Sequence, residues 1–219
     1  MSANDVRVWD LPTRLFHWIL TVLLVMQYAT ASFGVLDMRW HVYLGYATLA
    51  LVLFRVLWGF FGSPTSRFAA FVRGPAAVLG YLRAVLSTNP QRSIGHNPAG
   101  GWAVLALLGC VVLQGVSGLF ARDFAGNAGA LAAHVSERTV RFMSEVHEWN
   151  QNLLLILVAI HIVAVMLYLV LGNDNLILPM ITGRKTIVGK EPEQASPTRA
   201  LALLAIAVAA VAALVFSAR

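Results

Sequence analysis

The chain has 219 residues, of which 58% are hydrophobic and only 12% are charged, and its mean hydropathy is +0.72. Soluble domains carry about 25% charged residues, so a soluble globule of this composition would have too few charges to cover its surface. The composition excludes a cytosolic enzyme, a disordered chain and a disulfide scaffold, and it predicts an integral membrane protein. The net charge of +6 is better explained by membrane orientation than by nucleic acid, because the basic residues lie mostly between apolar segments.

Five segments are long and apolar enough to cross a bilayer, which takes about 20 residues. They cover residues 15–36, 41–62, 101–121, 149–173 and 200–218. The first four predict an all-α, four-helix bundle that could hold a haem, and the alanine-rich fifth predicts a C-terminal accessory helix. We therefore expect residues 1–187 to form the bundle and residues 188–219 to form a linker and the fifth span.

Three connecting segments have patterns of their own. Residues 75–87 place apolar side chains on one helical face, which predicts a helix lying at the membrane interface. Residues 128–145 have mixed charge and are compatible with a helix that leads into the fourth span. Residues 183–196 are polar and contain Pro192, which is typical of a linker.

The distribution of Lys and Arg predicts the orientation of the chain. With the N-terminus inside, ten of these residues lie on the cytoplasmic side and five lie on the opposite side. Because cytoplasmic loops carry the excess of positive charge, we expect the N-terminus in the cytoplasm and the C-terminus in the periplasm.

Four of the six histidines lie in or at the mouth of a span, where ionisable groups are rare and functional by default. His147 and His161 are fourteen residues apart, so they share one face of a helix at two depths about 21 Å apart. The antiparallel course of the spans pairs His41 with His147 at the outer side and His17 with His161 toward the inner side. The inner pair matches less well in depth, and a first helix that starts at Leu11 would reduce the difference.

Two opposed imidazoles suit a low-spin haem that carries electrons, whereas zinc usually takes three or four clustered ligands. The single Cys110 and the absence of a C-x-x-C-H motif exclude covalently attached haem. His96 and His134 lie in loops, and His134 could replace His147 as the outer ligand. A haem-free transporter or scaffold, which would be colourless, is the alternative from another functional class.

Arg55 is the one charged residue inside the second span. It follows His41 by fourteen residues and so lies on the same helix face, at the depth of the inner pair. An Arg at the bilayer centre costs about 2.5–3.5 kcal/mol unless it is paired, and a haem propionate is a suitable partner. The alternative is that its side chain extends to the cytoplasmic surface.

Several segments together resemble the bacterial transmembrane di-haem cytochrome b superfamily, which includes the b-type subunit of nickel–iron hydrogenases. They are VRVWDLPTRLFHW at residues 6–18, WHVYLGYATLALVLFRVLWGFFG at 40–62, GHNPAGGW at 95–102, SEVHEWNQNLLLILVAIHIVAV at 144–165 and NLILPMITGRK at 175–185. The resemblance covers about residues 6–187. It implies that His17, His41, His147 and His161 bind two haems b.

The resemblance also implies electron transfer between the quinone pool and a redox partner protein, in the bacterial inner membrane. The partner would be a c-type cytochrome or a dehydrogenase or hydrogenase subunit, and a bound quinone is compatible with this role. No catalytic residue is expected in the chain itself. The alternative within the same fold is a self-contained quinol oxidase that reacts with a small oxidant such as superoxide, steered by outer-side arginines.

Overall fold

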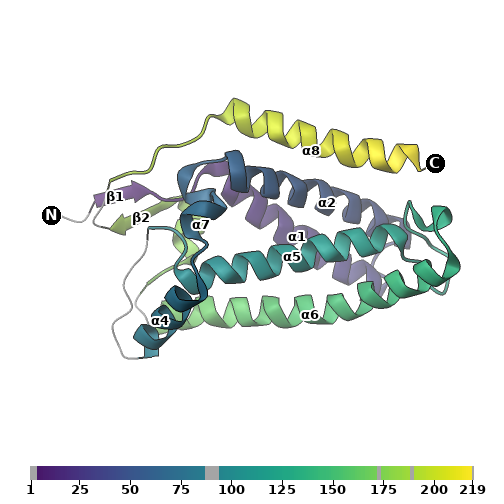
Figure 1. The fold of residues 1–219 in the computed structure, drawn as a ribbon, viewed down its shortest axis with the longest axis horizontal. Helices are drawn as coiled ribbons and strands as arrows, with labels where there is room; N and C mark the ends of the chain where they lie inside the picture. The colour runs from purple at the N-terminus through teal and green to yellow at the C-terminus, as the bar shows by residue number, and fades with distance from the viewer. Residues whose placement is uncertain (1–3, 87–93, 172–173, 188–189, 219) are drawn as a thin grey trace. The chain divides into compact units, whose positions relative to one another are not determined.

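The structure is a computed structural model that describes residues 4–86, 94–171, 174–187 and 190–218. In these residues it contains eight α-helices and two short β-strands (Figure 1). Five helices are long and apolar enough to cross a membrane. They are α1 (Leu11–Phe33), α2 (Met38–Phe61), α5 (Pro98–Phe120), α6 (Glu137–Val170) and α8 (Pro197–Ser217). The all-α membrane fold with a fifth long helix, predicted from hydropathy, is therefore confirmed.

All five long helices begin before their apolar segments, and in α1 and α6 a polar side chain caps the first turn. The carboxylate of Asp10 accepts a hydrogen bond of 2.7 Å from the backbone N–H of Thr13, which lets α1 start at Leu11. Ser136 accepts a bond of 3.2 Å from the backbone N–H of Thr139, and α6 starts one residue after it. At 34 residues α6 is about 51 Å long, which exceeds the roughly 30 Å of a hydrocarbon core.

Among the shorter elements, one helix was predicted from the apolar face of residues 75–87. Helix α4 (Pro75–Leu86) occupies the expected interfacial segment, whose last residue, 87, lies outside the described residues. The other short helices, which were not predicted, are α3 (Phe68–Phe71), α7 (Ile177–Thr182) and the 3₁₀ turns η1 (Pro64–Ser66) and η2 (Ala132–His134). Residues 172–173, at the end of the expected fourth span, also lie outside the described residues.

The chain divides into two compact units. Unit 1 comprises Met1–Leu15, Val56–Leu107 and Leu157–Ala200, and unit 2 comprises Phe16–Arg55, Leu108–Ile156 and Leu201–Arg219. The division does not follow the expected boundary at residue 187, because each unit takes segments from three parts of the chain. The separation of residues 188–219 from the bundle stays a prediction.

Unit 1 contains a small sheet where a linker was expected. Strand β1 (Asn4–Arg7) pairs antiparallel with β2 (Arg184–Ile187), and the two lie side by side in Figure 1. Val6 and Ile187 are buried on one side of this pair and pack with Trp9. Just before β2, the carbonyl oxygen of Gly183 accepts hydrogen bonds from the backbone N–H groups of Val8 and Trp9, which follow β1. The sheet therefore joins the two ends of the region that resembles a cytochrome b.

A buried polar network fixes the start of α1 within unit 1. Asp10 is only 3% exposed, and its carboxylate accepts hydrogen bonds from Trp58 Nε1 at 3.0 Å and from Ser66 Oγ at 3.1 Å. The hydroxyls of Thr13 and Ser66 lie 2.7 Å apart. This arrangement satisfies a buried carboxylate with several donors, as burial of a charge requires.

In unit 2 the fifth helix packs against α2. Ala50 of α2 and Val211 and Val215 of α8 form one buried cluster, and Tyr46 and Ala130 pack on it. The buried positions of α8 in this contact recur at helical spacing, while its other face carries exposed Ile206 and Phe216. Helix α8 thus has one face for the protein and one for lipid.

Candidate haem-binding site

His41 lies in the first turns of α2 and is held by the last turns of α1. Its Nδ1 is 3.1 Å from the carbonyl oxygen of Gln27 and 3.2 Å from Oγ1 of Thr30. The Thr30 hydroxyl in turn donates to the same Gln27 carbonyl at 2.8 Å. With Nδ1–H donating to these oxygens, Nε2 is the ring nitrogen available to a metal, as is usual for metal-bound histidines.

His147 on α6 has the same arrangement with α5. Its Nδ1 is 3.0 Å from the carbonyl oxygen of Gln114 and 3.2 Å from Oγ of Ser117. The Ser117 hydroxyl donates to the Gln114 carbonyl at 3.2 Å. Both outer histidines are therefore fixed by a glutamine carbonyl and by a hydroxyl three residues further along the neighbouring helix.

The side chains of Gln27 and Gln114 also make matching contacts, one between α1 and α2 and the other between α5 and α6. Gln27 donates to Thr48 Oγ1 on α2 at 2.7 Å, and the Oε1 atom of Gln114 accepts from Asn150 on α6 at 2.6 Å. Each glutamine thus joins the helix that precedes a histidine to the helix that carries it. These bonds fix the register of the two helices in each pair.

The structure brings His41 and His147 together. Their ring centroids are 6.3 Å apart and their planes cross at 82°. Two imidazoles that bind one metal from opposite sides, each through Nε2 at about 2 Å, have ring centroids roughly 6 Å apart. The separation of the two rings therefore fits a haem iron held between them.

Gly118 of α5 leaves room for the ring of His147. A Cβ atom at this position would lie 3.0 Å from Cε1 and 3.3 Å from Nδ1 of the imidazole, closer than ordinary van der Waals contact. The glycine therefore allows α5 to approach the ring closely enough for the two hydrogen bonds to Nδ1.

The predicted inner ligands lie on the expected helices. His17 is on α1 in unit 2, His161 is on α6 in unit 1, and both are half-buried. Their pairing with each other stays a prediction from the sequence. Arg55 is only 3% exposed, and its guanidinium lies 5.9 Å from the centroid of the Phe16 ring. Arg55 is thus beside α1 at the level of His17, and its burial does not support a side chain extended to the surface.

The two loop histidines have other surroundings. His134 is exposed in η2, whereas the imidazole that lies against His41 among the described residues is that of His147. His96 lies against two aromatic rings of unit 1, with centroids 4.7 Å from Trp9 and 4.5 Å from Phe71. Of the candidates for the outer ligand, His147 is the one that the structure places opposite His41.

Sequence reasoning missed the groups that hold the outer imidazoles. Gln27 with Thr30 and Gln114 with Ser117 form the same Q-x-x-[T/S] pattern on the helix before each histidine. This repetition was a usable signal, although the main contact is made by a backbone carbonyl, which any residue carries. The Asp10 network was also missed, since its partners come from separate segments.

Comparison with known proteins gives one family. A family model described as prokaryotic cytochrome b561 matches residues 8–183, which is most of the chain. The matched region contains all four predicted ligands and Arg55 and ends before α8. A comparison with curated proteins gives no significant match.

Proposed function

The chain belongs to the prokaryotic cytochrome b561 family, and on that premise we propose that it carries electrons through two haems b, each held by two histidines. Membership makes the chain a multi-pass membrane cytochrome of the b type that binds haem b and takes part in electron transfer. The proposal adds the ligands: His41 with His147 for an outer haem, and His17 with His161 for an inner one.

The observation that carries the proposal is the geometry of the outer pair. The rings of His41 and His147 are separated by the distance that two imidazoles need around one metal, and each Nδ1 already has its acceptors. Each ring is therefore oriented before any ligand binds, which reduces the ordering cost of binding. Hydrogen bonds to Nδ1 also make an imidazole a more basic ligand.

A haem b held by two histidines would exchange one electron at its iron and would leave no coordination position open for a substrate. What the chain contributes is the set of groups around it. Gln27, Thr30, Gln114 and Ser117 hold the two rings, and Gly118 leaves the space in which one of them sits.

The start of α1 supports the inner pair. The helix begins at Leu11, which is the boundary that the sequence-based pairing of His17 with His161 required. Arg55 is the proposed partner of a propionate of the inner haem, because an Arg can bind a carboxylate through two hydrogen bonds.

Replacement of Arg55 tests that role. Arg55→Gln removes a positive charge beside the proposed inner haem, so the reduced form of that haem loses stabilisation. One of the two reduction potentials should therefore fall by tens of millivolts, at about 59 mV for each 1.4 kcal/mol. Arg55→Lys, which keeps the charge, is the matched control. Two unchanged potentials in Arg55→Gln would contradict this assignment.

We further propose that the electrons pass between the quinone pool and a separate redox protein in the bacterial inner membrane. The excess of ten over five basic residues supports an N-terminus in the cytoplasm and a C-terminus in the periplasm. In this orientation the outer pair lies toward the periplasm, where a c-type cytochrome or the subunit of a dehydrogenase or hydrogenase could exchange electrons with it.

The pairing of the ligands is tested by removing them one at a time. His41→Ala and His147→Ala should lose the same haem, while His17→Ala and His161→Ala should lose the other, as measured by haem per chain and by the bands that remain in the reduced-minus-oxidised spectrum. His134→Ala is the control and should keep both. Loss of different haems in the two outer variants would refute the pairing.

A second candidate function is a self-contained quinol oxidase that reduces a small anionic oxidant such as superoxide. It is favoured by the exposed Arg138 and Arg141, which lie one to three turns before His147 on α6 and could attract an anion. Fast quinol turnover by the purified chain alone would favour this candidate. Turnover only with an added redox protein would favour the electron carrier.

A further inference from the structure

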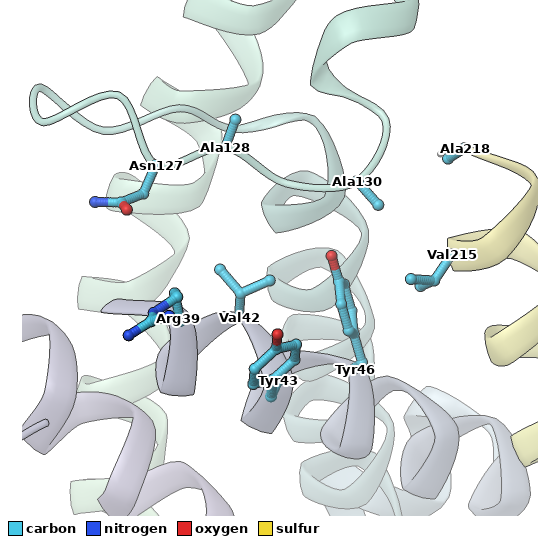
Figure 2. A pocket seen from close by; sticks show the side chains of 9 residues that line it. All are labelled: Arg39, Val42, Tyr43, Tyr46, Asn127, Ala128, Ala130, Val215 and Ala218. Carbon is cyan, nitrogen blue, oxygen red and sulfur yellow. The ribbon is translucent and has the colours of Figure 1, made fainter. Parts of the chain in front are cut away.

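Unit 2 contains a cavity of about 240 Å³ that involves the fifth helix. On one side α2 contributes Tyr43 and Tyr46, whose hydroxyls point toward the segment that carries Ala128 (Figure 2). On the other sides the walls are small and apolar, with Ala130 before η2 and Val215 on α8. The cavity thus combines two phenol donors with a smooth apolar surface.

The charges around the cavity favour a neutral ligand. Arg39 lines it, but its guanidinium is bonded to the carboxylate of Asp37 at 3.0 Å. Asn127 also lines it, and its amide nitrogen donates to Asp123 at 2.7 Å. With the cation balanced by its own carboxylate, an anion such as a lipid phosphate gains little here. A ligand that accepts hydrogen bonds without carrying charge fits better.

The size and surroundings favour a flat ring with an apolar tail. Pockets for drug-sized ligands are roughly 300–1,000 Å³, so this cavity holds a single ring and leaves a longer substituent outside. Outside the cavity, α8 exposes Leu214 and Phe216, which offer an apolar surface to such a tail. A quinone has this shape, with two carbonyl oxygens that accept hydrogen bonds.

We propose that this cavity binds the ring of a quinone or quinol, with Tyr43 and Tyr46 donating to its oxygen atoms and α8 forming its apolar wall. The inference rests on the proposed function and gives the quinone a place. Val42, which also lines the cavity, directly follows His41 on α2, so the site is next to the outer ligand along that helix. The wall that α8 provides, with Val215 and Ala218, lies outside the matched residues 8–183, whereas the two tyrosines lie inside them.

The test measures the affinity of decylubiquinone for the purified full-length, haem-loaded chain by titration calorimetry. The double variant Tyr43→Phe/Tyr46→Phe removes up to two neutral hydrogen bonds and should weaken binding about tenfold or more. Ala218→Trp fills the cavity from the end of α8 and should abolish binding. Tyr28→Phe and Ile206→Trp make the same changes away from the cavity and should bind as the unaltered chain does.

A photoreactive azidoquinone gives a second readout that does not depend on any variant. It should label peptides that contain residues 38–46 or 121–131, and labelling confined to other peptides would overturn the proposal. Unchanged affinity in both cavity variants would also overturn it, as would loss of a co-purified phospholipid from Ala218→Trp without any change in quinone binding. Haem per chain, measured in every sample, separates the two hypotheses: a chain with two haems that binds no quinone refutes this site alone, while a chain without haem refutes the proposed function.

Discussion

Gly118→Ala is the change that tests most sharply how the outer histidine is held. In a helix interior, alanine is about 1 kcal/mol more favourable than glycine, so the substitution by itself should stabilise α5. The added Cβ, however, would lie 3.0 Å from Cε1 of His147, and that ring is fixed through Nδ1 to Gln114 and Ser117. The ring must move by a few tenths of an ångström, which weakens bonds worth about 0.5–1.5 kcal/mol each.

Gly109 on the same helix supplies the control, because a Cβ there would meet nothing within 4 Å. We expect Gly109→Ala to keep both haems and to match or exceed the thermal stability of the unaltered chain. Gly118→Ala should be about 1–2 kcal/mol less stable than Gly109→Ala and should lose part of one haem or shift its absorption band. Equal stability, haem content and spectra in the two variants would refute the account of the packing around His147.

Three further predictions follow from other contacts. Ser117→Ala removes one acceptor from the outer imidazole and makes it a less basic ligand, so one reduction potential should rise by up to about 60 mV in a redox titration; a fall or no change would contradict this. Asp10→Asn places an amide donor against the Trp58 indole N–H and should lower stability by about 1–3 kcal/mol, whereas Asp37→Asn at the exposed surface should have little effect on the melting temperature. Burial, and then the hydrogen bond to the hydroxyl of Tyr168, raises the pKa of Tyr81. The protonated phenol therefore contributes its full share of the folding free energy below the ordinary pKa near 10, and this share is lost as the pH rises through the raised pKa. Tyr81→Phe should lessen the loss of stability that alkaline titration causes.

The helices were predictable because their signal is local. Apolar runs of about 20 residues located all five long helices, and the amphipathic pattern located α4. The true starts of α1 and α6 depend instead on capping by Asp10 and Ser136, which hydropathy does not register. The β1–β2 pair was missed because four-residue strands separated by nearly the whole chain have no local signature.

For the candidate site, helical spacing was more informative than residue type. The fourteen residues between His147 and His161 placed both on one face of a helix, and the antiparallel course of the chain placed His41 opposite His147, where the structure has it. The acceptors of the imidazole N–H groups are backbone carbonyls of Gln27 and Gln114, so side-chain chemistry could not reveal them. The cavity that includes Val215 depends on how α8 packs, which an all-round apolar helix leaves undetermined.

Binding of two haems by four histidines is tested most directly by the amount of haem b per purified chain, measured together with a potentiometric titration of the reduced-minus-oxidised spectrum. We expect two haems per chain and two one-electron steps, both with low-spin spectra, because four histidines provide two pairs of ligands. A single haem per chain from cells with ample haem supply would contradict the four-ligand assignment, and no haem at all would contradict the proposed electron carrier.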